Sequence, residues 1–231
     1  MRIRRKKWAA TELANCSFYI DEPNVNFNKW RELFNNNNPI HLELGCGKGT
    51  FIAKLASSNI GINYIAVDMI EAMLGLSKRN IEYEYNLKNL NFSNIFLIRS
   101  NIEYIGKVFG EKDKIDRIYI NFCNPWPRGK HNKRRLTHPR QLEQYKQFLN
   151  KEAEIYFKTD DDMLFEESII YFEKSNFTII NKTYDLANDD IFDGNIETEH
   201  EKMFMESGIK IKALIAKINN WNPKLIMLKC K

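Results

Sequence analysis

From residue 39 onward the sequence alternates short apolar segments with segments of helical periodicity, and this alternation limits the fold more than any other feature. Short apolar runs bounded by turn residues predict strands, whereas apolar residues three and four apart predict helices that bury one face. The expected strands are 40–44, 63–67, 95–99, 115–122, 153–158, 177–185 and 210–217. The expected helices are 49–58, 71–87, 102–108, 138–150, 162–174 and 200–206. Strands that alternate with helices predict an α/β fold, with a mainly parallel sheet covered on both faces.

The last predicted strand, 210–217, differs from the others because it alternates polar and apolar residues and follows strand 177–185 after a short connection. This pattern favours an antiparallel strand at the edge of the sheet. The 231 residues fit a single domain with a basic N-terminal arm over about residues 1–20. In open sheets of this kind ligands bind beyond the carboxyl ends of the strands, so the segments that follow the strands are expected to carry the chemistry.

Positive charge is concentrated in two short segments. Five basic residues lie within residues 2–7 and five more within 128–135, and neither segment contains an acid. Removing these ten from the 35 Lys and Arg leaves 25 against 30 Asp and Glu, so the rest of the chain is acidic. Two basic clusters on an acidic body favour contacts with nucleic-acid phosphates over an ordinary solvated surface. Their members are Arg2, Arg4, Arg5, Lys6, Lys7, Arg128, Lys130, Lys133, Arg134 and Arg135.

Several classes of protein are excluded. The longest apolar runs, such as Phe96-Leu97-Ile98, are too short to span a bilayer, and no apolar run follows the basic N-terminus, so neither a membrane protein nor a secretory signal is expected. The four cysteines form no CxxC pair and no Cys/His spacing typical of metal ligands, which indicates reduced thiols in a cytoplasmic protein. They are Cys16, Cys46, Cys123 and Cys230.

The segment that closes the first predicted strand, Glu43–Gly49, combines an acid with three glycines in the spacing G-x-G-x-G. Glycines allow a sharp turn and a close approach of a ligand, and this spacing fits neither the dinucleotide nor the Walker pattern. The carboxylate of Glu43 suits a cationic amine, and Asp68 at the end of the second strand suits ribose hydroxyls. The segment therefore predicts S-adenosylmethionine as cofactor, bound by Glu43, Gly45, Gly47 and Asp68; the structural alternative is a tight turn between exposed acids.

Two more segments follow predicted strands. Asn101 either reaches the adenine edge of the cofactor or caps the next helix. The segment Asn121–Pro127 contains two prolines that flank a tryptophan and cannot continue a sheet, so it forms a stiff aromatic loop. Trp126 either stacks on a base or covers the core. Because the basic segment 128–135 follows directly, a phosphate-binding surface is expected beside the cofactor pocket.

At these positions the sequence resembles a known family, the bacterial tRNA (guanine-N7-)-methyltransferases. The resemblance is carried by Trp8 and by five segments, Leu42–Gly49, Asn121–Pro127, Arg128–Leu136, Phe157–Asp160 and Thr198–Glu201. It implies a Rossmann-like class I methyltransferase fold, with a seven-stranded, mostly parallel sheet whose last strand is antiparallel. The implied activity is transfer of a methyl group from S-adenosylmethionine to N7 of a guanine in tRNA.

The resemblance also implies roles for individual residues. Cofactor contacts are implied for Glu43, Asp68, Asn101 and Asn124, and Asn124 is the candidate catalytic residue. Substrate contacts are implied for Arg128, Asp160, Thr198 and Glu201. The remaining members of the second basic cluster, Lys130, Lys133, Arg134 and Arg135, are expected to hold tRNA phosphates. The expected assembly is a monomer or a homodimer that uses neither a membrane nor a metal.

Asn124 departs from the family pattern, which usually has aspartate there, and Asp68 stands where the family tends to have glutamate. N7 of guanine has a lone pair and no proton, so position 124 need not supply a base. Asn-Pro-aromatic motifs also occur in methyltransferases that modify amino groups, so an enzyme acting on adenine N6 or a glutamine amide is one alternative. A non-catalytic RNA-binding relative is another, and the intact glycine turn argues against it.

Two of these motifs have structural alternatives. Thr198 and Glu201 match a capping box at the start of a helix, which needs no substrate. The three acids at 160–162 suit a helix N-terminus, where the dipole favours negative charge. The same acids look like a metal site, but no second motif supports one, so no metal is expected.

Overall fold

The computed structural model describes residues 6–189 and 195–219, and within them eight strands form one sheet. The strand order is β1-β4-β3-β2-β5-β6-β8-β7. The strands are β1 (Tyr19–Ile20), β2 (Ile40–Leu44), β3 (Asn63–Asp68), β4 (Ile95–Arg99), β5 (Ile115–Asn121), β6 (Leu149–Thr159), β7 (Phe177–Thr183) and β8 (Lys212–Ile218). The seven predicted strands are all present, and the eighth is the two-residue β1, which pairs with β4.

All pairings from β1 to β6 are parallel, whereas β8 runs antiparallel to both of its neighbours, β6 and β7. The predicted antiparallel direction is therefore confirmed, but the predicted place at the edge is wrong, because β7 is the edge strand. The alternating pattern misleads because the lysine that begins β8, Lys212, is buried and donates to the backbone oxygen of Asp160 at 3.0 Å. The edge strand β7 shows the alternation that was expected of β8, because exposed side chains alternate with more buried ones along it.

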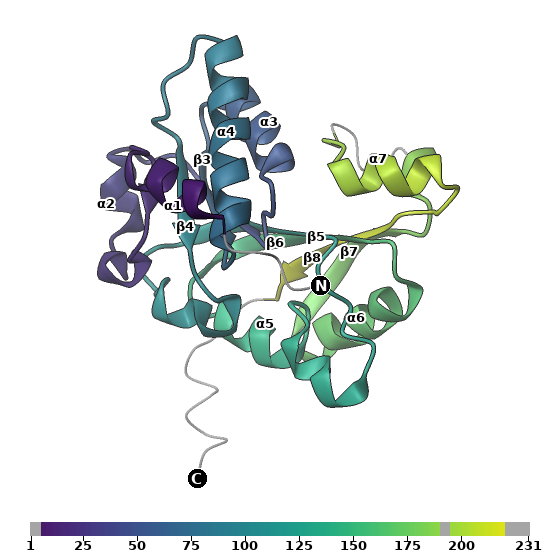
Figure 1. Ribbon diagram of the computed structural model, residues 1–231. Coiled ribbons are helices and arrows are strands. Elements are labelled where there is room, and N and C mark those ends of the chain that lie inside the picture. Colours follow the sequence, from purple (N-terminus) through teal and green to yellow (C-terminus); the bar gives the residue numbers. More distant parts are fainter. Residues whose placement is uncertain (1–5, 190–194, 220–231) are drawn as a thin grey trace.

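Helices cover both faces of the sheet, as the alternation predicts (Figure 1). On one face lie α3 (Thr50–Ser58), α4 (Glu71–Leu87) and α7 (Glu199–Glu206); on the other lie α5 (Pro139–Tyr145) and α6 (Asp162–Lys174). Each face has its own apolar core. One core joins α5 and α6 to the sheet, and the other joins α3 and α4 to it.

Two helix predictions need correction. Residues 102–107 form a 3-10 helix, η2 (Ile102–Lys107), rather than an α-helix. The helix predicted over 138–150 ends at Tyr145, because the chain turns into β6 four residues later and Leu149 pairs with Ile115. Leu149 has the right spacing for the face shared by Leu142 and Tyr145, yet it belongs to a strand.

The described part of the N-terminal arm is packed against the domain. It forms α1 (Lys7–Ala14) and β1, followed by η1 (Pro23–Asn26) and α2 (Trp30–Phe34). Trp8 lies against Gly75 of α4, where a Cβ would come within 2.8 Å of the Trp8 ring, so only glycine permits this approach. The first five residues, with Arg2, Arg4 and Arg5, lie outside the described residues, as does Cys230.

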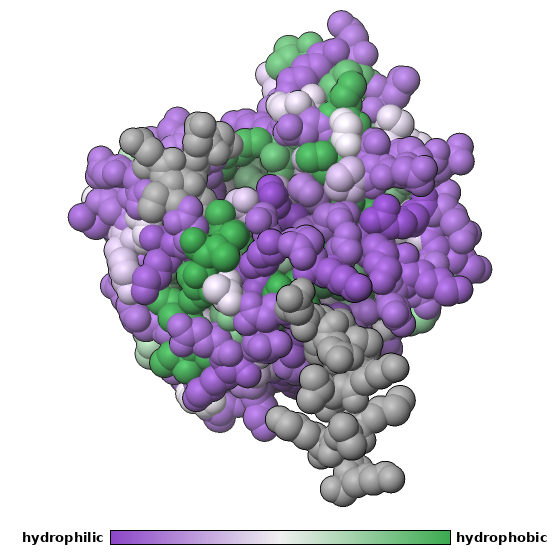
Figure 2. All heavy atoms as spheres, turned by 180° about the vertical axis from the view of Figure 1, so that it is seen from behind, coloured by the Kyte–Doolittle hydropathy of each residue, from purple (hydrophilic) through white to green (hydrophobic). Residues whose placement is uncertain are grey.

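The strand order reverses between the adjacent strands β2 and β5: β3 and β4 lie beyond β2, whereas β6, β8 and β7 lie beyond β5. Folds of this kind bind ligands at such a reversal point. Around this edge the connections include η3 (Gly129–Arg134), and η4 (Leu186–Asn188) follows β7. None of the helices in the described ranges is long and apolar enough to cross a membrane. Seen from behind, the surface is mainly hydrophilic, with smaller hydrophobic areas (Figure 2).

Candidate active site

The glycine turn after β2 is tied to the end of β3. Gly45, Gly47 and Gly49 all have positive φ angles, of 81°, 54° and 71°, which favour glycine. The Gly47 N–H donates to Asp68 Oδ2 at 3.0 Å, and the Ile70 N–H donates to Asp68 Oδ1 at 2.8 Å. Asp68 is almost buried, and burial raises the pKa of its carboxyl group. Asp68 therefore holds the turn in shape and stands at its open side.

Glu43, at the end of β2, is buried and incompletely paired. Its Oε1 accepts a hydrogen bond of 3.1 Å from Asn121 Nδ2, at the end of β5. Glu43 Oε2 and Asn121 Oδ1 have no partner among the described residues. Burial raises the pKa of Glu43 to about 8, since a carboxylate is poorly solvated there. Two acceptor oxygens without donors, next to a glycine turn, suit a ligand that carries an ammonium group.

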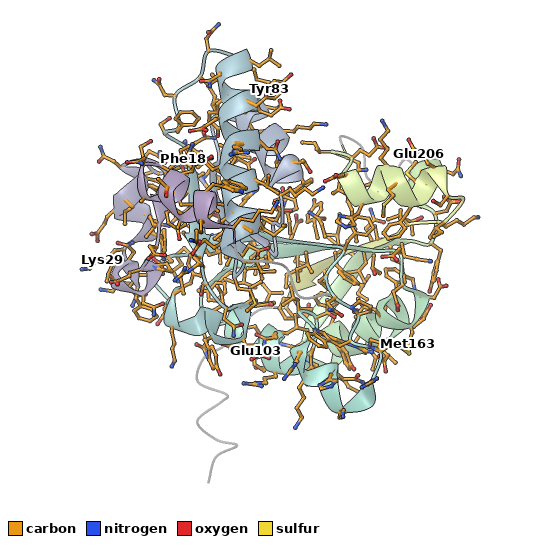
Figure 3. The ribbon with its side chains drawn as sticks, in the orientation of Figure 1. Phe18, Lys29, Tyr83, Glu103, Met163 and Glu206 are labelled. Atoms are coloured by element: carbon orange, nitrogen blue, oxygen red, sulfur yellow. The ribbon has the colours of Figure 1, made fainter. Side chains whose placement is uncertain are left out.

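A cavity of about 550 Å³ opens beside this turn. Its lining brings together five residues predicted from sequence as cofactor contacts or basic-cluster members: Gly45, Asp68, Asn101, Asn124 and Arg134. Met69, Ile70 and Ile102 add apolar walls. Glu43 and Gly47 are not part of the lining, but both are bonded to residues that lie at the turn or beside it. Figure 3 shows Glu103, which also lines this cavity, below the sheet.

Two asparagines of the cavity wall already use their carbonyl oxygens. Asn101 Oδ1 accepts from the Glu103 N–H at 3.0 Å, so the capping interpretation of Asn101 is correct, and the residue also lines the cavity. Asn124 Oδ1 accepts from the Trp126 N–H at 3.0 Å and so fixes the loop after β5. In that loop Phe122 and Trp126 have positive φ angles of 50° and 43°, which side chains rarely adopt.

The second basic cluster divides into exposed and buried members. Arg128, Lys130, Lys133 and Arg134 are exposed, and the Arg134 guanidinium lies 5.1 Å from the Trp126 ring centre. Arg135 is buried and forms an ion pair with Glu167. It also donates to the backbone oxygen of Pro125 at 2.6 Å. The expectation that Arg135 holds phosphates is therefore corrected: its guanidinium supports the loop from inside and is not available to RNA.

The capping-box interpretation of the last motif is also correct, and the box is closed. Thr198 Oγ1 accepts from the Glu201 N–H at 2.9 Å, and Glu201 Oε2 accepts from the Thr198 N–H at 3.3 Å. Glu201 is only 2% exposed, and its Oε2 also accepts from Lys158 Nζ at 3.1 Å. Its Oε1 accepts from Asn195 at 2.6 Å. Both oxygens of Glu201 are thus engaged by the protein itself.

Sequence reasoning missed Lys158. This lysine of β6 is buried between Glu201 and the Phe51 ring, and burial lowers its pKa. It pairs in register with Asn121 of β5, so Glu43, Asn121, Lys158 and Glu201 form a polar row across the carboxyl edge of the sheet. A lysine inside an apolar strand is the only sequence signal for such a role. It is a weak signal without knowledge of its partner.

The three consecutive acids at 160–162 have separate surroundings. Asp161 caps α6 and Asp162 pairs with Lys212. Asp160 directly follows β6, whose Lys158 pairs in register with Asn121 and accepts from the Phe122 N–H at 2.9 Å, so Asp160 lies beside the start of the loop that lines the cavity. No group of three or more possible metal ligands is found in residues 6–189 and 195–219.

Comparison with known proteins decides the family. Residues 37–214 match a family model described as "Putative methyltransferase". The chain is 58% identical over 220 residues to a tRNA (guanine-N(7)-)-methyltransferase of Clostridium beijerinckii, covering 95% of this chain and 100% of that one. The chain belongs to the tRNA (guanine-N(7)-)-methyltransferase family. A second member, from Ruminiclostridium cellulolyticum, is 55% identical over 217 residues and covers 94% of this chain and 92% of its own.

Solved structures support the fold. The crystal structure of the 16S rRNA methyltransferase KamB aligns with a TM-score of 0.58, over 83% of this chain and 93% of that one, at 12% identity. At this identity the likeness concerns the fold alone, and it confirms the class I methyltransferase architecture expected for this tRNA (guanine-N(7)-)-methyltransferase family member.

Proposed function

We infer that this protein transfers a methyl group from S-adenosylmethionine to N7 of a guanine in tRNA. The family places the chain among enzymes of this activity. The observation that carries the inference within the molecule is the buried pair of Glu43 and Asn121, in which one oxygen of each side chain has no partner among the described residues. Such a pair favours a ligand with an ammonium group, as S-adenosylmethionine has.

We propose that the cofactor lies along the 550 Å³ cavity. Glu43 and Asn121 would receive the ammonium group, the backbone at Gly45 and Gly47 would lie against the methionine part, and Asp68 would accept from the ribose hydroxyls. Ile70 and Ile102 would cover the adenine, with the Asn101 amide at its edge. When bound, the cofactor supplies a methyl group on a positively charged sulfur.

The chemistry asks little of the protein beyond placement. N7 of guanine attacks with its own lone pair and loses no proton, so no side chain has to act as a base. Holding the two reactants in line contributes up to ~7–11 kcal/mol. We therefore propose that Asn124, whose carbonyl oxygen is already used by the Trp126 N–H, is compatible with activity. Asn124 would act on the shape of the loop while it lines the cavity.

For the base itself we propose Asp160, which directly follows β6 beside the start of the loop that lines the cavity, as the carboxylate that accepts from guanine N–H groups. Glu201 and Thr198 would contribute by fixing α7, since both oxygens of Glu201 are bonded within the protein. A direct contact of Glu201 with guanine requires that Asn195 be displaced.

The exposed cations Arg128, Lys130, Lys133 and Arg134 are proposed to contact tRNA phosphates beside the cavity mouth. Because tRNA is the substrate, we place the protein in the cytoplasm. We also propose that the chain acts as one domain, as a monomer or a homodimer.

Nucleoside mass spectrometry tests the proposal. Unmodified tRNA is incubated with purified protein and methyl-labelled cofactor, then digested to nucleosides. We expect label in 7-methylguanosine for wild type and for Asn124→Asp. Label in methylated adenosine or in protein glutamine would support an amino-directed enzyme instead. Absence of any label, with S-adenosylmethionine binding intact in calorimetry, would support an RNA-binding protein without turnover.

A further inference from the structure

Three aromatic rings lie close together, one from Phe122 in the cavity lining and two from α7, His200 and Phe204. The Phe122 ring, from the first residue after β5, stacks on the His200 ring with centres 5.9 Å apart and an angle of 21°. It also lies 5.8 Å from the Phe204 ring, and His200 and Phe204 are 6.2 Å apart. His200 is exposed, and Phe122 is half-buried and lines the cavity. Phe122 also packs against the small apolar cluster of Leu186, Ile211, Ala213 and Ile215, so the part of its side chain that lines the cavity is the part available to a planar ligand.

The protein holds these rings in place with several independent contacts. His200 and Phe204 are four residues apart on α7, so both point to the same side of the helix. The start of α7 is fixed by the Lys158–Glu201 pair and by an ion pair of 2.6 Å between Lys48 and Glu199, which ties the helix to the glycine turn. Tyr83 of α4 and Glu206 of α7 show that both helices stand on the same side of the sheet (Figure 3).

Phe122 reaches this position, in the cavity lining and against His200, in an unfavourable backbone conformation. Its φ of 50° lies in the left-handed region, while its N–H donates to the backbone oxygen of Lys158 at 2.9 Å. Such strain in a non-glycine residue is concentrated at functional sites, where the surrounding structure enforces it. The turn carries the ring from the sheet edge to the boundary between the cavity and α7.

The reaction gives an aromatic surface a specific use. The bond from sulfur to the methyl carbon breaks and its electron pair stays on sulfur, while the N7 lone pair forms the new bond. The positive charge therefore moves from sulfur to the purine ring, and no proton is released. The face of an aromatic side chain attracts a positively charged purine more strongly than it attracts a neutral purine. An aromatic side chain stacked on the guanine therefore stabilises the transition state more than it stabilises the bound substrate.

Trp126 is the other aromatic residue of the cavity, and its surroundings differ. The Arg134 guanidinium lies over its ring at 5.1 Å, and the His131 ring lies 5.6 Å away. A guanidinium on the indole opposes a second cation in the same place. The geometry therefore favours Phe122 over Trp126 as the surface that receives a purine acquiring positive charge.

We propose that Phe122, with His200 beside it on α7, is the stacking platform for the target guanine, and that Phe122 positions this base for the reaction. This inference rests on the proposed function. The base leaves the RNA stack, lies against the Phe122 face, and turns N7 toward the methyl group. Stacking on a ring does not depend on hydrogen bonds and leaves guanine recognition to Asp160.

The test uses the full-length protein with S-adenosylhomocysteine and tRNA in which 2-aminopurine replaces the guanine that nucleoside mapping identifies. Stacking on an aromatic ring quenches the fluorescence of 2-aminopurine. The fluorescence is therefore expected to stay low with the wild type and to rise several-fold with Phe122→Leu. With normal tRNA, Phe122→Leu should raise KM by about ten-fold or more and lower kcat a few-fold further. Phe122→Tyr should keep values close to wild type, and in Phe122→Leu the change in KM for tRNA should exceed any change in cofactor affinity measured by calorimetry.

The controls separate the possible failures. Phe204→Leu removes a ring of the same cluster that does not line the cavity and should keep the base dark. Unchanged fluorescence and KM in Phe122→Leu would overturn the inference, as would loss of quenching in Trp126→Leu alone. If Phe122→Leu does not fold, exposed His200 decides: His200→Phe should keep the base darker than His200→Ala, and equality of the two would overturn the inference. A wild type that makes no 7-methylguanosine contradicts the proposed function instead.

Discussion

Replacing Glu43 with Gln should have opposite effects on the empty protein and on cofactor binding. Glu43 is 3% exposed, and burial raises its pKa from 4.5 to about 8. The folded state therefore keeps a proton that the unfolded state releases between these pH values. The wild type should lose stability as the pH rises through this window, whereas the Gln variant, which does not titrate there, should not.

The magnitude follows from the pKa. Each pH unit from 4.5 to about 8 should increase the stability difference in favour of Glu43→Gln by about 1 to 2 kcal/mol, to a total of roughly 5 kcal/mol, with no further change above pH 8. Cofactor binding should change in the other direction. At pH 8 the ionised Glu43 forms a charged contact with the ammonium group that Gln cannot form. The variant should therefore bind S-adenosylmethionine about 10- to 150-fold more weakly than the wild type at pH 8, and the difference in affinity should be smaller at pH 6.

Urea unfolding from pH 5 to 9 measures the first quantity, and calorimetric titration at the same pH values measures the second. Glu82→Gln is the matched control, since it removes a carboxylate of α4 that pairs with Lys78 outside the cavity. It should stay within about 0.5 kcal/mol of wild type. A stability difference that does not vary with pH, or equal cofactor affinities at pH 8, would refute the assignment of Glu43.

Three other perturbations have defined outcomes. Asp68→Ala should weaken S-adenosylmethionine binding by about 1–3 kcal/mol in calorimetry, because it removes a charged acceptor and frees two backbone N–H groups of the turn; an unchanged dissociation constant would remove this residue from the site. Neutralising Lys133 and Arg134 together should lower the slope of log affinity for tRNA against log salt by roughly one and a half to two units. Arg135→Met should leave this slope unchanged, because Arg135 is buried, and should lower the free energy of unfolding in urea by about 2–3 kcal/mol. Lys158→Met should cost about 3–5 kcal/mol, because its buried carboxylate partner is left unpaired, and a loss below 1 kcal/mol would contradict the row of charges at the sheet edge.

Periodicity and motif spacing were sufficient for the outline of the protein. The seven long strands, the helices on both faces and the antiparallel direction of β8 follow from local apolar patterns. The glycine turn and Asp68 were also predictable, because positive φ angles and strand ends leave a sequence signature. These features depend on neighbours in the chain.

Partners from distant parts of the chain decided the rest. Arg135 reads as one more cation in a basic run, but its neighbours from α6 and the loop after β5 bury it. Lys212 and Lys158 read as polar residues in strands, yet both are buried with partners that only the folded chain supplies.

The same division holds at the active site. The sequence by itself determined the family and the chemistry that Glu43 suits, because that chemistry depends on residue type and spacing. Only the tertiary structure decided that both oxygens of Glu201 are occupied, and that Phe122 meets His200, which lies 78 positions later in the chain. Burial and partner identity are properties of the packed chain, and no local pattern encodes them.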